Sequence, residues 1–175
     1  MQFLNNSKNY SLNRKTYINL RWIAIIGQFI AINLATFLFQ YDFAFIKANF
    51  VVLIGAISNI YLISFYSKNL LSNRTAFNFL IIDILQLTLL FYFTGGILNP
   101  FIIFLIIPSV FASLSLEKKT NFILILITFI SILFLTFYYE QSTLPLPDRS
   151  QLSDYFYFSI SISLTIALLF LNFFA

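Results

Sequence analysis

Long apolar runs separated by short polar joins dominate the chain. Six runs of roughly 16–21 residues follow one another, and a helix of about 20 residues spans the hydrocarbon core of a bilayer. They cover residues 22–39, 50–66, 76–93, 101–116, 122–139 and 155–175. Because the runs are continuous rather than alternating, they favour helices over the strands of a barrel. The pattern predicts an all-α integral membrane protein, a bundle of six transmembrane helices.

Composition excludes a soluble domain and several kinds of chemistry. Hydrophobic residues make up 60% of the 175 positions and charged residues only 9%, whereas soluble domains have about a quarter charged residues. The sequence contains no cysteine and no histidine. Disulfides, thiolate or imidazole metal sites, a phosphoacceptor histidine and Ser-His-Asp catalysis are therefore excluded. We expect no catalysis and no metal site from this chain alone.

The positive charges predict the orientation in the membrane. With the N-terminus inside, eight of the ten Lys and Arg residues lie on the cytoplasmic side, namely Lys8, Arg14, Lys15, Arg21, Lys68, Arg74, Lys118 and Lys119. Lys47 and Arg149 lie outside, so the bias favours cytoplasmic N- and C-termini. Residues 1–21 form a cytoplasmic N-terminal segment and residues 22–175 the membrane domain. Arg21 and Trp22 are expected to anchor the first helix at the interface.

One formal charge lies deep in a predicted helix. Asp83 sits in the third apolar run, where a carboxylate is costly and usually functional or paired. Gln86 and Thr94 fall on the same helical stripe. Three roles stay open for Asp83: a proton or ligand site, a structural interhelical hydrogen bond, or a neutral buried acid. Its candidate structural partners in the first two helices are Gln28, Asn33 and Asn59.

The join after the third run reads Gly-Gly-Ile-Leu-Asn-Pro-Phe at residues 95–101. Read as a tight turn, Gly95 and Gly96 allow positive φ, and Pro100 takes the first position of the next helix. Asp83 lies about 18 Å below Gly95 along a helix.

Read as a ligand site, the same join offers bare backbone N–H groups, the Asn99 amide and the Phe101 ring. A quinone has two carbonyl acceptors, a flat ring and a lipid tail, and this position suits all three. Pro108 is expected to kink the fourth helix and open room beside the site.

These residues resemble a known family. Asp83-Ile84-Leu85-Gln86-Leu87, followed by Thr94, residues 95–101 and Pro108, is similar to the RegB/PrrB/ActS family of redox-sensing histidine kinases. That family carries a G-G-x-x-N-P-F heptapeptide between the third and fourth of six transmembrane helices, and residues 95–101 match it in full. Residues 20–24 with Gly27 and Gln28 are similar to the family's first helix.

The resemblance implies a redox sensor that binds ubiquinone. The expected quinone-binding residues are Gly95, Gly96, Asn99, Pro100 and Phe101, with Asp83, Gln86 and Thr94 as supporting polar residues. A cytoplasmic region for dimerisation, phosphorylation and ATP binding would follow the sixth helix. Because the chain stops within an apolar run and lacks kinase motifs, we expect it to be truncated.

The same resemblance implies the setting and the partners. The protein would be a multi-pass protein of the bacterial inner membrane, in contact with the lipid bilayer and the quinone pool. A homodimer and a response regulator are the expected protein partners in a two-component system, with no direct nucleic-acid contact.

Two other readings stay open. A transporter or permease fragment would use Asp83 and a proline-broken fourth helix in a transport path. A membrane scaffold subunit would use its polar residues only to lock the helices together.

Overall fold

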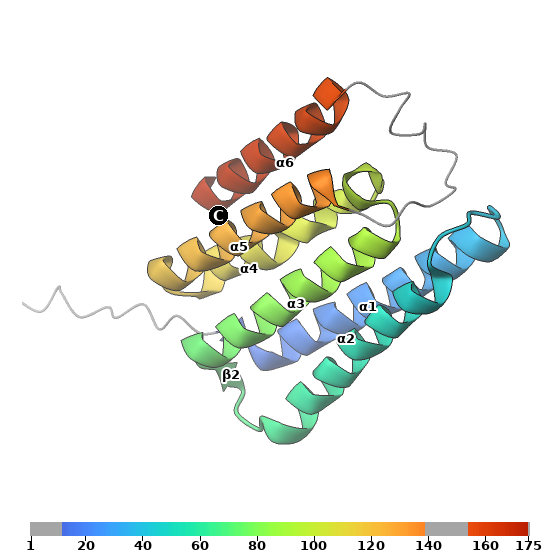
Figure 1. The fold of residues 1–175 in the computed structure, drawn as a ribbon. Coiled ribbons are helices and arrows are strands. Elements are labelled where there is room, and N and C mark those ends of the chain that lie inside the picture. The colour runs from blue at the N-terminus through green and yellow to red at the C-terminus, as the bar shows by residue number, and fades with distance from the viewer. Residues whose placement is uncertain (1–11, 139–153, 175) are drawn as a thin grey trace, which may run out of the picture.

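The computed structural model describes residues 12–138 and 154–174, and its long elements are all helices (Figure 1). The helices are α1 (Arg14–Phe37), α2 (Phe45–Phe65), α3 (Asn73–Phe93), α4 (Ile107–Ser115), α5 (Lys118–Phe137) and α6 (Asp154–Phe174). Two 3₁₀ segments, η1 (Gly96–Leu98) and η2 (Ile102–Ile106), precede α4. Strands β1 (Leu12–Asn13) and β2 (Leu70–Leu71) form a small antiparallel pair. The predicted all-α six-helix class is confirmed, with this unpredicted strand pair added.

Lipid-facing surfaces follow from the apolar helices. Within the described residues, α1, α2, α3, α5 and α6 are long and apolar enough to cross a membrane by length and composition. Large side chains such as Phe50, Ile57 and Ile162 are exposed, as expected where acyl chains replace water. The cytoplasmic location of both termini stays a prediction. Residues 1–11 of the predicted N-terminal segment, and residues 139–153 with most of the predicted outer loop, lie outside the described residues.

The first helix starts earlier than the apolar pattern predicts. α1 begins at Arg14, ahead of the predicted span at residues 22–39. The Asn13 side chain accepts a hydrogen bond from the Thr16 amide at 3.1 Å and caps the helix, which satisfies one of its free N–H groups. Residues 14–21 are therefore helical, and they carry Tyr17 and Arg21 into the bundle.

The fourth apolar run is not a single α-helix. The segment predicted as 101–116 starts as the 3₁₀ helix η2 and becomes α4 at Ile107, with Pro108 in the first turn of α4. Proline has no N–H, and its ring clashes with the carbonyl four residues earlier. The expected break at Pro108 therefore takes the form of a change in helix type. The prediction that Pro100 opens the helix is wrong, because Pro100 lies in the turn before η2.

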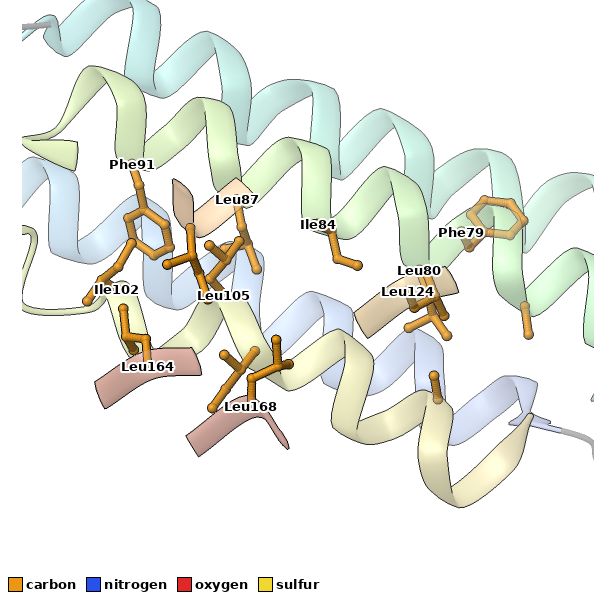
Figure 2. Close-up of a cluster of buried hydrophobic side chains, with 14 of the residues drawn as sticks. Phe79, Leu80, Ile84, Leu87, Phe91, Ile102, Leu105, Leu124, Leu164 and Leu168 are labelled. Atoms are coloured by element: carbon orange, nitrogen blue, oxygen red, sulfur yellow. The ribbon is translucent and has the colours of Figure 1, made fainter. Parts of the chain in front are cut away.

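α3 is the central helix of the bundle. Helices α1 and α2 lie on one side of it, and α4 and α5 lie on the other, with α6 covering α4 and α5 (Figure 1). Figure 2 shows buried side chains of the larger core, contributed by α3, η2, α5 and α6: Phe79, Leu80, Ile84, Leu87, Phe91, Ile102, Leu105, Leu124, Leu164 and Leu168. A smaller core packs α1 and α2 against α3: Ile25, Ile32, Ala48, Val51, Val52 and Leu90. α1 packs mainly along α2, and some of its residues share a groove with residues of α3, η2 and α4.

Candidate functional site

A groove of about 610 Å³ runs along α1, where that helix faces α3 and the η2–α4 segment. This volume lies within the roughly 300–1,000 Å³ typical of small-molecule sites. Its walls are largely apolar, and its polar side chains gather at three levels. We call these levels the outer turn (residues 94–101), the amide pair (Gln28 and Gln86) and the ion-pair cluster (Tyr17, Arg21 and Asp83). "Outer" and "inner" follow the orientation that the charge bias predicts.

The outer turn is held closed by Asn99. The Asn99 Nδ2 amide donates to the Thr94 backbone oxygen at 2.9 Å and to Thr94 Oγ1 at 2.8 Å. Asn99 Oδ1 accepts from the Phe101 backbone N–H at 2.8 Å. Thr94 Oγ1 in turn donates to the Leu90 carbonyl at 2.8 Å. The side chain of Asn99 thus ties the end of α3 to the start of η2.

The two glycines form the part of this turn that lies away from the groove. Gly95 and Gly96 have φ of 105° and 61°, in the left-handed region that other residues rarely adopt. Their carbonyls accept from the Leu98 and Asn99 amides, each at 3.2 Å. Both glycines are buried and do not border the groove.

Aromatic rings frame the groove where the turn meets η2. The Phe101 and Phe104 rings are stacked with centroids 6.0 Å apart, and each side chain is about half exposed. Pro108 and Phe111 continue this wall along α4. The wall offers a flat ring an apolar surface that also borders the lipid.

The amide pair lies midway along the groove. Gln86 Nε2 of α3 donates to Gln28 Oε1 of α1 at 2.8 Å. Gln86 is buried, Gln28 is half-buried, and both line the groove. Gly55 of α2 lets the backbone approach this pair, since a Cβ placed there would lie 3.5 Å from the Gln86 amide.

The ion-pair cluster closes the inner end. Arg21 Nη2 and Nε of α1 lie 2.8 and 2.9 Å from Asp83 Oδ1 of α3. The Tyr17 hydroxyl donates to Asp83 Oδ2. Arg21 also donates to Ser58 Oγ at 2.9 Å and to Asn59 Oδ1 at 3.4 Å on α2. Three helices therefore share one charged pair, and Asp83 still borders the groove.

Two expectations about this cluster are wrong. Arg21 is not an interface anchor, because only 6% of it is exposed and its guanidinium lies over the Tyr17 and Phe79 rings. The predicted partners of Asp83 are also wrong: Gln28 bonds Gln86, Asn33 bonds Asn49, and Asn59 bonds Arg21 and the Ile18 carbonyl. A carboxylate inside a membrane is best stabilised by a countercharge with additional hydrogen bonds, and Arg21 supplies that charge.

Sequence reasoning missed Tyr17 and Arg21 as groove residues. Their signal is present in the spacing, because Tyr17, Arg21 and Gln28 recur at intervals of four and seven on one helical face. A polar stripe on a transmembrane helix indicates a protein-facing side. Tyr17 and Arg21 were not assigned to this stripe because the apolar run, and with it the predicted helix, starts only at Trp22.

The structure brings most of the predicted site residues to one groove. Its lining includes Asp83, Gln86, Thr94, Asn99, Pro100 and Phe101. Gly95 and Gly96 stay behind the turn. Asp83 and the heptapeptide are far apart along the axis of α3. They lie toward opposite ends of the same groove.

Comparison with known proteins gives two matches. Residues 9–175 match the profile of the family described as the PilS-like transmembrane domain. Over 161 residues the chain is 30% identical to the sensor histidine kinase RegB of Cereibacter sphaeroides. The aligned region covers 90% of this chain and 34% of RegB. The chain thus spans about a third of the length of this curated relative. No solved structure matches the chain. These matches confirm the resemblance that residues 83–108 indicated.

Proposed function

Since this chain belongs to the PilS-like transmembrane domain family, as a RegB-like membrane sensor domain of a multi-pass bacterial membrane protein, we propose that it binds ubiquinone as the redox-sensing input of a histidine kinase. One observation carries the proposal. The groove along α1 has Asn99, Pro100 and Phe101 of the heptapeptide at its outer end. A cavity of this size that borders lipid suits a ligand delivered by the membrane.

The aromatic wall and the apolar lining suit the two parts of a quinone. The ring would pack against Phe101, where offset stacking adds to apolar burial. The isoprenoid tail would lie along apolar side chains of α1 and leave toward the lipid past the stacked Phe101 and Phe104 rings. Each buried CH₂ group of such a tail contributes about 0.8 kcal/mol.

Asn99 supplies the polar contact at the outer turn. Its Nδ2 makes two bonds to Thr94, and the one to Thr94 Oγ1 can be exchanged for a quinone carbonyl. The exchange leaves Thr94 Oγ1 bonded to the Leu90 carbonyl. The net cost is small, because one hydrogen bond replaces another. Gly95 and Gly96 contribute by holding the turn that presents Asn99.

Signalling follows from where the groove lies. A ligand that touches α1 on one wall and η2 on the other favours one spacing of these elements over another. It can shift the bundle only by its differential affinity for the two arrangements. We propose that oxidised quinone favours the arrangement that lowers autophosphorylation of an ATP-dependent kinase region outside this chain. The homodimer and the response regulator belong to the same proposal.

The test is ubiquinone binding to the purified chain in nanodiscs, measured by equilibrium partition of a short-tailed analogue. We expect saturable binding by the parent and a loss of about fivefold for Asn99→Ala, equal to about one net hydrogen bond. Asn49→Ala is the matched control, because Asn49 bonds Asn33 and the Phe45 carbonyl away from the groove. Equal affinity of Asn99→Ala and Asn49→Ala would remove Asn99 from the site. Absence of saturable binding by the parent would overturn the proposal.

A further inference from the structure

Two amide atoms in the middle of the groove have no protein partner. Gln86 and Gln28 share one hydrogen bond, from Gln86 Nε2 to Gln28 Oε1. Within residues 12–138 and 154–174, nothing accepts from Gln28 Nε2 and nothing donates to Gln86 Oε1. Both residues line the groove. An amide atom without a protein partner in an apolar groove is available to a polar group of a ligand.

The two free atoms are one donor and one acceptor of the same hydrogen-bonded amide pair. A hydroxyl group can accept from Gln28 Nε2 while donating its own hydrogen to Gln86 Oε1. A carbonyl oxygen can accept from Gln28 Nε2 but has no hydrogen to donate to Gln86 Oε1. Gln86 Oε1 would therefore stay unpaired and would face the lone pairs of the carbonyl oxygen. Sites built to bond a hydroxyl discriminate strongly against analogues that lack it.

The neighbouring polar groups do not offer the same contact. Asp83 lies one turn before Gln86, but Tyr17 and Arg21 occupy its two oxygens. Thr94 is eight residues beyond Gln86, which is about 12 Å along α3. Asn99 and the amide pair therefore lie at different depths of the groove. The groove has two separate polar positions for a head group.

We propose that the Gln28–Gln86 amide pair is a second, inner head-group position that selects the reduced, hydroxyl-bearing form of the quinone. The inference rests on the proposed function and deepens it. The outer turn presents an exchangeable amide donor, which suits a carbonyl. The amide pair presents a donor and an acceptor, which suits a hydroxyl. The two redox forms of one ligand would then occupy different depths of one groove.

The variant test compares affinities for a short-tailed ubiquinone and its ubiquinol. We expect Gln28→Met and Gln86→Met each to weaken ubiquinol binding by about tenfold, the equivalent of one net hydrogen bond. Ubiquinone binding should change by less than about twofold. Asn33→Met is the matched control on α1, since Asn33 bonds Asn49 and does not line the groove. Equal losses for both redox forms, or no loss for ubiquinol, would overturn the inference.

A ligand-side test uses the unaltered protein and needs no variant to fold. The dimethyl ether of the short-tailed ubiquinol keeps the ring and tail but has no hydroxyl hydrogen. The inference expects it to bind at least about tenfold more weakly than the ubiquinol. Equal affinity for the two compounds would overturn the inference while leaving the proposed function intact. A parent protein that binds neither redox form would instead overturn the proposed function.

Discussion

Arg21 and Asp83 form an ion pair of 2.8 Å between α1 and α3, although they are 62 positions apart in the chain. The pair is enclosed by the Tyr17 hydroxyl and by Ser58 and Asn59 of α2. A single guanidinium thus links the three helices that precede the outer turn. Its position at the inner end of the groove makes it the principal polar constraint on how α1 lies against the rest of the bundle.

Removing one member of this pair should destabilise the bundle strongly. Arg21→Met leaves the Asp83 carboxylate without its countercharge, and breaking a buried pair in this way costs about 3–5 kcal/mol. The double variant Arg21→Met with Asp83→Leu should recover much of that loss, because an apolar pair suits the membrane interior. Thermal unfolding of the single and double variants in detergent measures the coupling. Additive losses would show that the two side chains do not act as a pair.

Gly95 should be required for the turn rather than for contact with a ligand. Gly95→Ala places a side chain at φ of 105°, which costs about 1–3 kcal/mol of backbone strain. The expected result is a lower unfolding temperature, whether or not quinone is present. Gly27→Ala is the control, because replacing a glycine inside a helix by alanine typically stabilises by about 0.5–1 kcal/mol. A fully stable Gly95→Ala protein would contradict the turn geometry.

Gly27 offers a way to fill the groove without disturbing the fold. It lines the groove, and a Cβ placed on it meets no atom within 4 Å. We expect Gly27→Leu to keep or raise the unfolding temperature, since leucine is a better helix former, while lowering ubiquinone affinity at least about tenfold. The measurement is partition binding alongside thermal unfolding. Unchanged affinity in a folded Gly27→Leu protein would place the ligand elsewhere.

The sequence predicts the number and approximate positions of the helices, because long apolar runs determine membrane crossing. It also locates the turn at residues 95–101, where glycine and proline restrict the backbone. The partner of Asp83 could not be predicted in this way. Hydropathy gives the spans but not their rotation, and a charge near the end of a span, such as Arg21, fits an interface anchor as well as a buried ion pair.

The fourth segment illustrates a second limit. Pro108 signals a break, but the sequence does not determine whether the chain kinks or changes to a 3₁₀ helix, as it does in η2. The role of Asn99 was similarly underdetermined. An amide side chain in a turn can bond a ligand or the nearby backbone. In the structure the Asn99 side chain hydrogen-bonds Thr94 and the Phe101 backbone amide.

Photolabelling tests the central claim, that the groove along α1 binds ubiquinone, most directly. A photoreactive ubiquinone analogue would be crosslinked to the chain in nanodiscs, and the labelled peptides would be identified by mass spectrometry. The account predicts labels on groove residues of α1 and of the segment from Phe101 to Phe111, removed by excess unlabelled ubiquinone. Labels spread over lipid-facing residues such as Ile162 and Phe170 of α6, and unaffected by the competitor, would contradict it.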